Sequence, residues 1–169
     1  FRLPKSMAQG NRSRGTVVSE PVTAVDIPVT LFSMAGLKQP WEMHGHDLSP
    51  LIEDPEAPWG KPSLLVHTAK QYGSDTDSIP DKSDPKLYHG PGVPWYVLLS
   101  QGRYKYVRTL IEGETEELYD LVSDPDELRN LAGDADYADL LKRYRKTAIK
   151  ELKRTDAGFV DKLPSVASN

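Results

Sequence analysis

The sequence predicts a small antiparallel β-sheet covered on one face by a C-terminal amphipathic helix. Two aromatic and β-branched runs, 95–99 and 104–108, flank Gln101-Gly102 and predict a β-hairpin. A third short run at 117–121 follows closely, and strands that are close in sequence usually pair as an antiparallel meander. Apolar residues then recur at helical spacing over 137–152 and form the single stripe of an amphipathic helix.

A separate helix is predicted at 26–35, before the sheet. Its apolar residues recur at helical spacing, and Asp26 is placed to cap its first turn. Pro28 suits the first turn and Gly36 suits the position after the last one. The tail before it, 1–15, is polar and basic and carries no periodic apolar face.

Between this helix and the hairpin, the sequence predicts a connection, one strand and a long loop. The segment 38–62 is rich in Pro, Gly and acidic residues and is predicted to be an ordered surface connection with one compact apolar patch at 48–52. The mostly apolar run 63–68 predicts a buried strand, which brings the sheet to about four strands. The following 71–94 is predicted to be one long loop, a class of segment that often carries function.

Two further helical signals follow the sheet. Asp124-Pro125-Asp126-Glu127 has the arrangement of a capping box and predicts a turn of helix that runs to Asn130. The last helix is expected to begin near Asp134 and to be closed by Gly158 and Pro164.

Composition excludes several classes of protein. The chain has 169 residues, the length of about one domain, and its formal net charge of −4 disfavours generic nucleic-acid binding. The absence of cysteine excludes a disulfide framework, a cysteine metal site and a thiol nucleophile. No stretch approaches the roughly 20 apolar residues that span a bilayer. Because the sequence starts at Phe1 rather than Met, we expect a piece of a longer protein.

Two clusters resemble metal ligands. His44-Gly45-His46-Asp47 places two imidazoles on a loop, but a plain loop with capping duties is the favoured interpretation. Calcium loops of the EF-hand type need Gly at the sixth position and Glu at the twelfth, and counting from Asp75 these positions hold Pro80 and Lys86. A solvated loop therefore explains the acidic residues Asp75, Asp77, Asp81 and Asp84 better.

The last helix is strongly basic. A polar back face that complements the helix dipole explains this charge, and anion binding is the alternative. The cationic residues are Lys142, Arg143, Arg145, Lys146, Lys150, Lys153 and Arg154. The sequence contains no Gly-rich phosphate cradle, nucleophile elbow or HExxH motif, so the residues alone complete no catalytic set.

Three stretches together resemble the type I sulfatases. Residues 22–36 resemble the family's VDxxPTLLxLAG helix, and 44–52 are similar to the G-x-S/D-L-x-PLL segment that follows it. Residues 102–107 leading to 117–132 resemble the GRYKYI…EELYDLxxDPxExxNLA signature. The order and spacing of these motifs match the family over nearly the whole chain.

The resemblance implies an α/β fold of the alkaline-phosphatase type, of which this chain is the C-terminal part. Residues 1–60 would form the end of the catalytic α/β domain, including an edge segment and helix, and 61–169 would form the C-terminal subdomain with its small sheet. Such enzymes hydrolyse sulfate esters, here expected to be those of a carbohydrate. Calcium is implied as the cofactor of the intact enzyme and none is expected to bind this fragment.

The family's nucleophile is a formylglycine made from Cys or Ser in a C/S-x-P-x-R motif, and this motif is missing here. Ser-x-Pro occurs at Ser19, Ser78, Ser83 and Ser123, but none has Arg at the fifth position, and no Asp-Asp pair is present for the metal. We therefore expect no catalytic residue and no metal ligand in this chain, which by itself should be inactive. The expected partner is the N-terminal catalytic part of the same protein.

The resemblance also implies that a loop of the subdomain contributes to the rim of the substrate pocket. The candidate substrate-binding residues around the long loop are His67, Lys70, Tyr88, His89 and Trp95, which can stack on or hydrogen-bond a sugar. The alternative is that Tyr88 and His89 only decorate a loop while Trp95 belongs to the core.

Two other functions remain open. One is a stand-alone carbohydrate-binding or interaction module, which would have no reason to keep the helix at 26–36. The other is a fragment of a related phosphatase or phosphodiesterase. The family suggests a periplasmic or extracellular bacterial location. In the isolated fragment, Ile27, Leu31, Phe32 and Met34 are expected to form an exposed apolar patch because their packing partner is missing.

Overall fold

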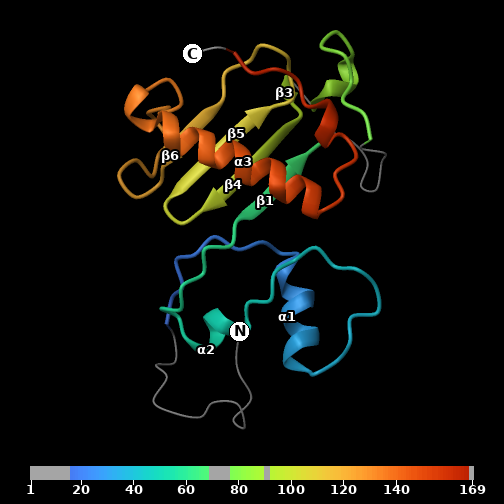
Figure 1. Cartoon of the computed structure of the whole chain (residues 1–169), viewed down its shortest axis with the longest axis vertical. Coiled ribbons are helices and arrows are strands. Elements are labelled where there is room, and N and C mark those ends of the chain that lie inside the picture. Colours follow the sequence, from blue (N-terminus) through green and yellow to red (C-terminus); the bar gives the residue numbers. More distant parts are fainter. Residues whose placement is uncertain (1–15, 69–76, 90–91, 168–169) are drawn as a thin grey trace. The chain divides into compact units, whose positions relative to one another are not determined.

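The computed structural model describes residues 16–68, 77–89 and 92–167 of the chain (Figure 1). The chain divides into two compact units, Phe1–Lys61 and Pro62–Asn169.

The described part of the first unit contains two helices. Helix α1 spans Asp26–Met34, in agreement with the prediction for 26–35. Helix α2, Ser49–Glu53, lies where the sequence predicted only a connection. Leu48, just before the helix, and Leu51 within it pack with Trp59 in a small core, so tertiary contact rather than helix propensity stabilises this five-residue helix.

The exposed apolar surface of α1 agrees in part with the prediction. Ile27 and Leu31 are 43% and 53% exposed, whereas Phe32 and Met34 are half-buried. Val29 and Thr30 face the interior of the unit. Ile27 and Leu31 therefore expose apolar surface to solvent, and this surface is suited to packing against another protein surface.

The second unit is built on a four-stranded antiparallel sheet with the strand order β1-β4-β5-β6. The strands are β1 Ser63–His67, β4 Tyr96–Gln101, β5 Tyr104–Thr109 and β6 Glu117–Asp120. Leu99 lies opposite Tyr106, which lies opposite Leu118, and these three residues are fully buried. The register therefore aligns one apolar row across the sheet and confirms the predicted meander.

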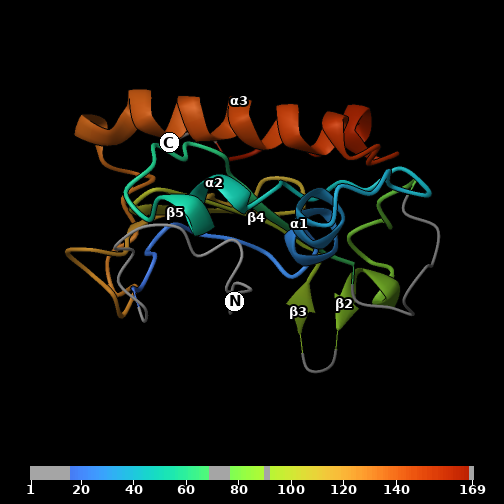
Figure 2. The same ribbon diagram turned by 90° about the horizontal axis from the view of Figure 1, so that it is seen from below.

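Helix α3, Ala138–Arg154, lies along one face of the sheet (Figure 2). A short 3-10 turn, Ala135–Tyr137, precedes it, and another, Val160–Lys162, follows. The predicted stripe is buried at Leu141, Tyr144, Ala148 and Leu152, which join the core that the sheet residues form. Of the helices in the described residues, none has both the length and the apolar character needed to cross a membrane.

The segment predicted as one long loop contains regular structure. A 3-10 turn at Pro85–Leu87 leads into strand β2, Tyr88–His89, which pairs with β3, Val93–Pro94. Leu87 is fully buried in the main core. Leu87, with the partly buried Ile79 and Tyr88, anchors the segment on the core, and this burial is a tertiary effect that a scan for apolar periodicity does not detect.

The helical turn predicted after Asp124 is absent, and that prediction is wrong. The Asp124 carboxylate accepts hydrogen bonds from the backbone N–H groups of Leu128 and Arg129, at 3.1 and 2.8 Å, rather than from a first helical turn. Glu127 has φ of +56°, a left-handed conformation that ends any helix there. The side chain of Glu127 instead pairs with Lys105 of β5, which holds the loop against the sheet.

Candidate functional site

An aromatic pair lies at the end of the sheet, on the face away from α3. The register places His67 of β1 directly opposite Tyr96 of β4, and their rings stack with centroids 5.0 Å apart and planes 24° from parallel. Because side chains alternate along a strand, both rings share a face with Leu65, which is 47% exposed, while Leu64 and Val66 pack into the core. Both rings are half-buried, and Nε2 of His67 is enclosed, so the pair exposes only part of its ring surface.

The other candidate substrate-binding residues occupy different environments. Tyr88 is half-buried, and its hydroxyl donates a hydrogen bond of 3.3 Å to the carbonyl of Lys82. Trp95 is only 5% exposed and belongs to the core, the alternative that the sequence had left open. Lys70 and the side chain of His89 lie outside the described residues. The structure thus brings His67 together with Tyr96, a partner that sequence reasoning missed because only strand register reveals it.

The His44–Asp47 segment is held against the start of α1. The Asp26 carboxylate accepts hydrogen bonds of 2.7 Å from the backbone N–H groups of Thr23 and His46. The Thr30 hydroxyl donates to the Asp26 carbonyl at 2.7 Å and accepts from the N–H of Leu48 at 2.9 Å. The motif residues at 22–36 and 44–52 therefore bind two backbone segments to each other.

The Asp47 carboxylate is also held by hydrogen bonds from nearby serines. Its carboxylate accepts hydrogen bonds from the Ser33 hydroxyl at 2.5 Å and from the N–H and hydroxyl of Ser49 at 2.9 and 2.6 Å. Burial raises the pKa of Asp47, but these hydrogen bonds outweigh it and the net direction is downward. The capping role favoured for this cluster fits these contacts.

The described residues do not fit a calcium site. No three His, Cys, Asp or Glu side chains among them lie close enough to hold a metal ion. Calcium takes six to eight oxygen ligands, and both carboxylate oxygens of Asp47 already accept hydrogen bonds from Ser33 and Ser49. We derive no chemical step through a metal from these residues.

The signature at 117–132 connects β6 to the loop that follows it. The Asn130 side chain accepts from the N–H groups of Leu118 and Ala132, at 3.0 and 2.9 Å, and donates to the carbonyl of Glu116 at 3.0 Å. Leu118, Leu131 and Ala132 are buried in the core. The most specific motif of the chain is therefore a folding element, and its residues need no catalytic role to explain them.

Asp120, at the end of β6, forms an ion pair with Arg103. Arg103 donates to it through Nε at 2.7 Å and through Nη2, and the N–H groups of Val122 and Ser123 add weaker contacts. The Arg103 guanidinium holds the pKa of Asp120 well below its usual range, although burial opposes this effect. The unfolded chain therefore binds a proton here at a higher pH than the folded chain does.

This pair predicts an acid-dependent contribution to stability. Because the folded-state pKa is lowered, the contribution is fully present above the unfolded pKa of about 4 and is lost as the pH falls below it. We expect Asp120→Asn to lower the free energy of unfolding by about 1–3 kcal/mol at pH 7 and by much less at pH 2. Urea unfolding at both values tests this, with the exposed Asp126→Asn as control. A difference that stays constant with pH would contradict it.

The chain is similar to curated sulfatases. It is 26% identical over 158 residues to an arylsulfatase of Clostridium perfringens, covering 94% of this chain and 28% of that protein. It is 31% identical over 121 residues to a Delta 4,5-hexuronate-2-O-sulfatase of Bacteroides thetaiotaomicron, covering 72% and 21%. An arylsulfatase K of Xenopus laevis is 31% identical over 127 residues, covering 72% and 20%. No protein-family model matches the chain.

Solved structures share the fold. A phosphonate monoester hydrolase of Agrobacterium radiobacter has a TM-score of 0.55 at 26% identity, covering 79% of this chain and 25% of that chain. A 2-O glycosaminoglycan sulfatase has a TM-score of 0.55 at 24% identity, covering 83% and 26%. At that identity the second likeness concerns the fold alone. The chain spans only 20–28% of the length of the curated relatives it matches.

Proposed function

Because this chain belongs to the sulfatases of the alkaline-phosphatase-like superfamily, as a C-terminal part, we propose that it serves an enzyme that hydrolyses sulfate esters of a carbohydrate. The observation that carries this proposal is the match to several sulfatases over 72–94% of the chain. The motifs that carry the likeness have folding roles in both units. The part of the enzyme that performs the chemistry is then the part that this chain lacks.

In this proposal the chain supplies structure and part of the pocket rather than the nucleophile. Residues 1–60 form the end of the catalytic α/β domain and 61–169 form the C-terminal subdomain. The formylglycine nucleophile and the calcium site belong to the N-terminal catalytic part, which is the partner of this chain. The exposed Ile27 and Leu31 support this arrangement, since they offer apolar surface for packing.

Activity of the full-length protein tests this function. We expect it to hydrolyse an aryl sulfate and a sulfated oligosaccharide, and we expect the 169-residue chain alone to hydrolyse neither. The likeness to a phosphonate monoester hydrolase makes phosphonate and phosphate monoesters the necessary controls. A clear preference for the phosphorus esters would show that the protein is one of the related hydrolases rather than a sulfatase. Hydrolysis by the chain alone would contradict the proposed division of roles. Carbohydrate binding without any hydrolysis by the full-length protein would favour a stand-alone module.

The rim of the substrate pocket is the proposed location of the stacked pair. The stacked, half-buried rings of His67 and Tyr96 offer an aromatic surface to a sugar ring. We include Lys70 and His89 in this proposal on the sequence alone.

Alanine variants of the full-length enzyme test the rim. We expect His67→Ala and His89→Ala to lower kcat/KM about five- to tenfold for a sulfated oligosaccharide, the value of about one ring contact for His67 and one hydrogen bond for His89. Hydrolysis of a small aryl sulfate, which does not reach the rim, should stay unchanged. The exposed Leu128→Ala serves as control. If a histidine variant keeps the wild-type kcat/KM on several sulfated sugars, that histidine does not belong to the site.

A further inference from the structure

The outer face of α3 carries an uncompensated basic stripe, formed by Lys142, Arg143, Lys146 and Lys150. All four side chains are exposed, and within the described ranges no carboxylate forms a salt bridge with any of them. The other three cations of the helix are paired: Arg145 with Glu116, Lys153 with Asp161 and Arg154 with Glu151. The free positive charge of α3 is thus concentrated on one side.

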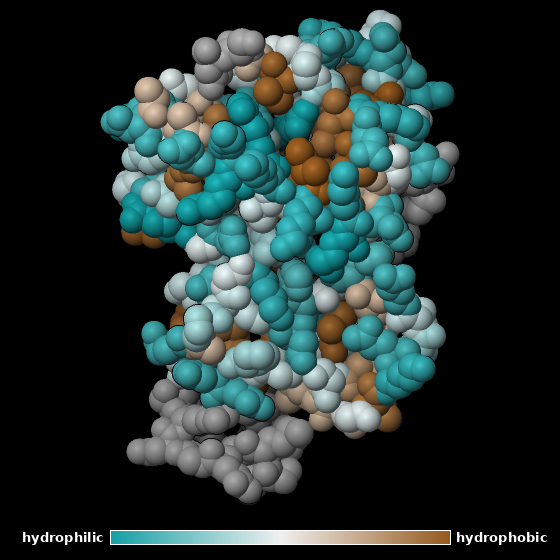
Figure 3. All heavy atoms as spheres, in the orientation of Figure 1, coloured by the Kyte–Doolittle hydropathy of each residue, from teal (hydrophilic) through white to brown (hydrophobic). Residues whose placement is uncertain are grey.

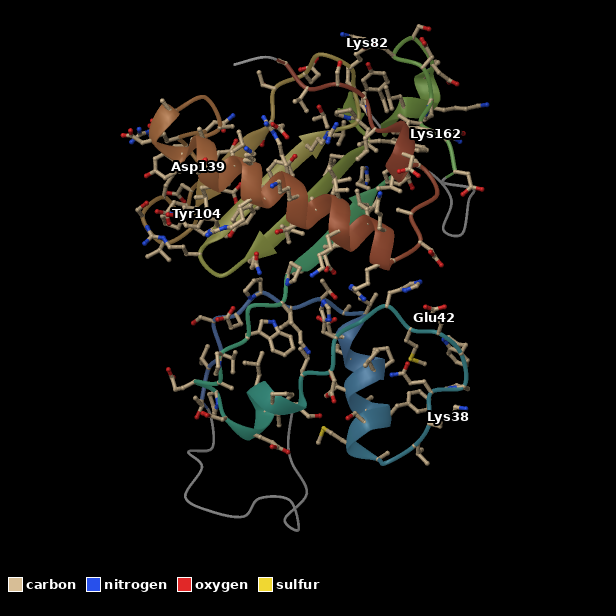
Figure 4. All side chains as sticks on the ribbon, in the orientation of Figure 1. Lys38, Glu42, Lys82, Tyr104, Asp139 and Lys162 are labelled. Atoms are coloured by element: carbon tan, nitrogen blue, oxygen red, sulfur yellow. The ribbon has the colours of Figure 1, made fainter. Side chains whose placement is uncertain are left out.

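The stripe borders a shallow depression. Lys142, Arg143, Lys146, Thr147 and Lys150 line it, together with a single acid, Asp139, at the N-terminal end of the helix. Hydrophilic side chains gather over α3 on this face of the molecule (Figure 3), and Asp139 is labelled on the helix in Figure 4. The surface is therefore open to a large, extended ligand.

The spacing of the cations suits a linear polyanion. Lys142, Lys146 and Lys150 follow one another every four residues, so they lie about 6 Å apart along the helix axis. Like charges at this spacing repel each other and destabilise a helix, and a bound polyanion relieves that repulsion. The helix dipole favours cations only within the last turn, so it does not explain Lys142 and Arg143, which lie in the N-terminal half of α3.

We propose that this basic stripe binds a sulfated polysaccharide chain outside the pocket where the ester is cleaved. The identity of the polyanion rests on the proposed function, because an enzyme that cleaves carbohydrate sulfates meets such chains as its substrate. A nucleic acid is the less suitable polyanion, since Tyr144, the aromatic residue next to Arg143, is buried and offers no ring on which a base could stack. Binding here keeps the enzyme on a long substrate between cleavage events.

A charge-reversal series tests the stripe. Dextran sulfate is the probe, with unsulfated dextran and a DNA duplex as comparison ligands. We expect Lys142→Glu/Lys146→Glu/Lys150→Glu to weaken dextran sulfate binding by about tenfold or more, and we expect wild-type binding to fall with added salt. The matched control Lys38→Glu/Lys82→Glu/Lys86→Glu makes the same change in net charge at exposed residues elsewhere and should bind nearly as wild type does.

Binding is measured without turnover, both on the 169-residue chain and on the full-length enzyme. Equal losses in both triple variants, equal affinity for the DNA duplex, or no binding of dextran sulfate would each overturn the proposal. Binding by the chain but not by the full-length enzyme would also overturn it, because the rest of the protein would then cover the stripe. A small aryl sulfate reports hydrolysis separately, so failure of the stripe and failure of the sulfatase function give different results.

Discussion

Replacement of Gly45 by alanine is expected to disrupt the first unit. A β-carbon at this position would lie 2.1 Å from the carbonyl oxygen and 2.6 Å from the carbonyl carbon of Val25, and 2.9 Å from Cα of Asp26. These are backbone atoms at the start of α1, so a side-chain rotation cannot relieve the clash. The segment would have to separate from α1, and the hydrogen bonds from His46 to Asp26 and from Leu48 to Thr30 would then be lost. We expect a loss of about 3 kcal/mol or more.

Amide hydrogen exchange measures this effect without assuming that the two units unfold together. In Gly45→Ala, protection of the α1 amides should fall sharply while protection of β4 and β5 is retained. Gly133→Ala is the matched control, because an added β-carbon there meets no atom within 4 Å. Unchanged protection of α1 in Gly45→Ala would show that the close approach of these two segments is not required.

Truncation of Glu116 to alanine is expected to have the largest effect in the second unit. Glu116 is 4% exposed and accepts a hydrogen bond of 2.5 Å from the hydroxyl of Tyr106 and one of 2.6 Å from Nε of Arg145. Burial, reinforced by this carboxylate, raises the pKa of Tyr106 far above its ordinary value, so the phenol stays a donor. Removing Glu116 leaves a buried hydroxyl and a partly buried guanidinium without a partner. The expected cost is about 3 kcal/mol, since Arg145 is 34% exposed and can regain some water.

Graded variants separate this network from ordinary packing. Tyr106→Phe removes one hydrogen bond and should cost about 1 kcal/mol, while the exposed Glu114→Ala should cost nearly nothing. Urea unfolding combined with hydrogen exchange of β5 and β6 gives all three values. A cost for Glu116→Ala no greater than that for Glu114→Ala would contradict the assigned role of the network.

Much of the fold was accessible from local sequence patterns. The alternation of aromatic and β-branched residues indicated β4 and β5, and the apolar stripe of α3 indicated the residues that are buried, such as Leu141 and Leu152. These patterns are readable because a strand or helix that packs on one face repeats its apolar residues with a fixed period. Helix α2 and the β2–β3 hairpin lacked such a repeat. Helix α2 is held by scattered contacts with Trp59, and the hairpin segment is held by Leu87, Ile79 and Tyr88.

The candidate site was only partly predictable. His67 was proposed from its chemistry, and its stacking partner Tyr96 is set by the pairing of β1 with β4. The aromatic character of Trp95 suited either a sugar platform or a core, and burial assigned it to the core. The capping-box prediction was wrong because Asp124 and Glu127 bind a loop and the sheet rather than a helical turn.

By itself, the sequence determined the order of the main elements and the family likeness, because both depend on short patterns of residue type. Only the tertiary structure decided what the patterned residues do. Asp26, Gly45 and Asn130 act on backbone segments distant in sequence, and Glu116 reaches partners on β5 and α3. Such contacts depend on which segments lie next to each other in space. Strand register and close packing determine this, and the local conformational preference of each residue does not.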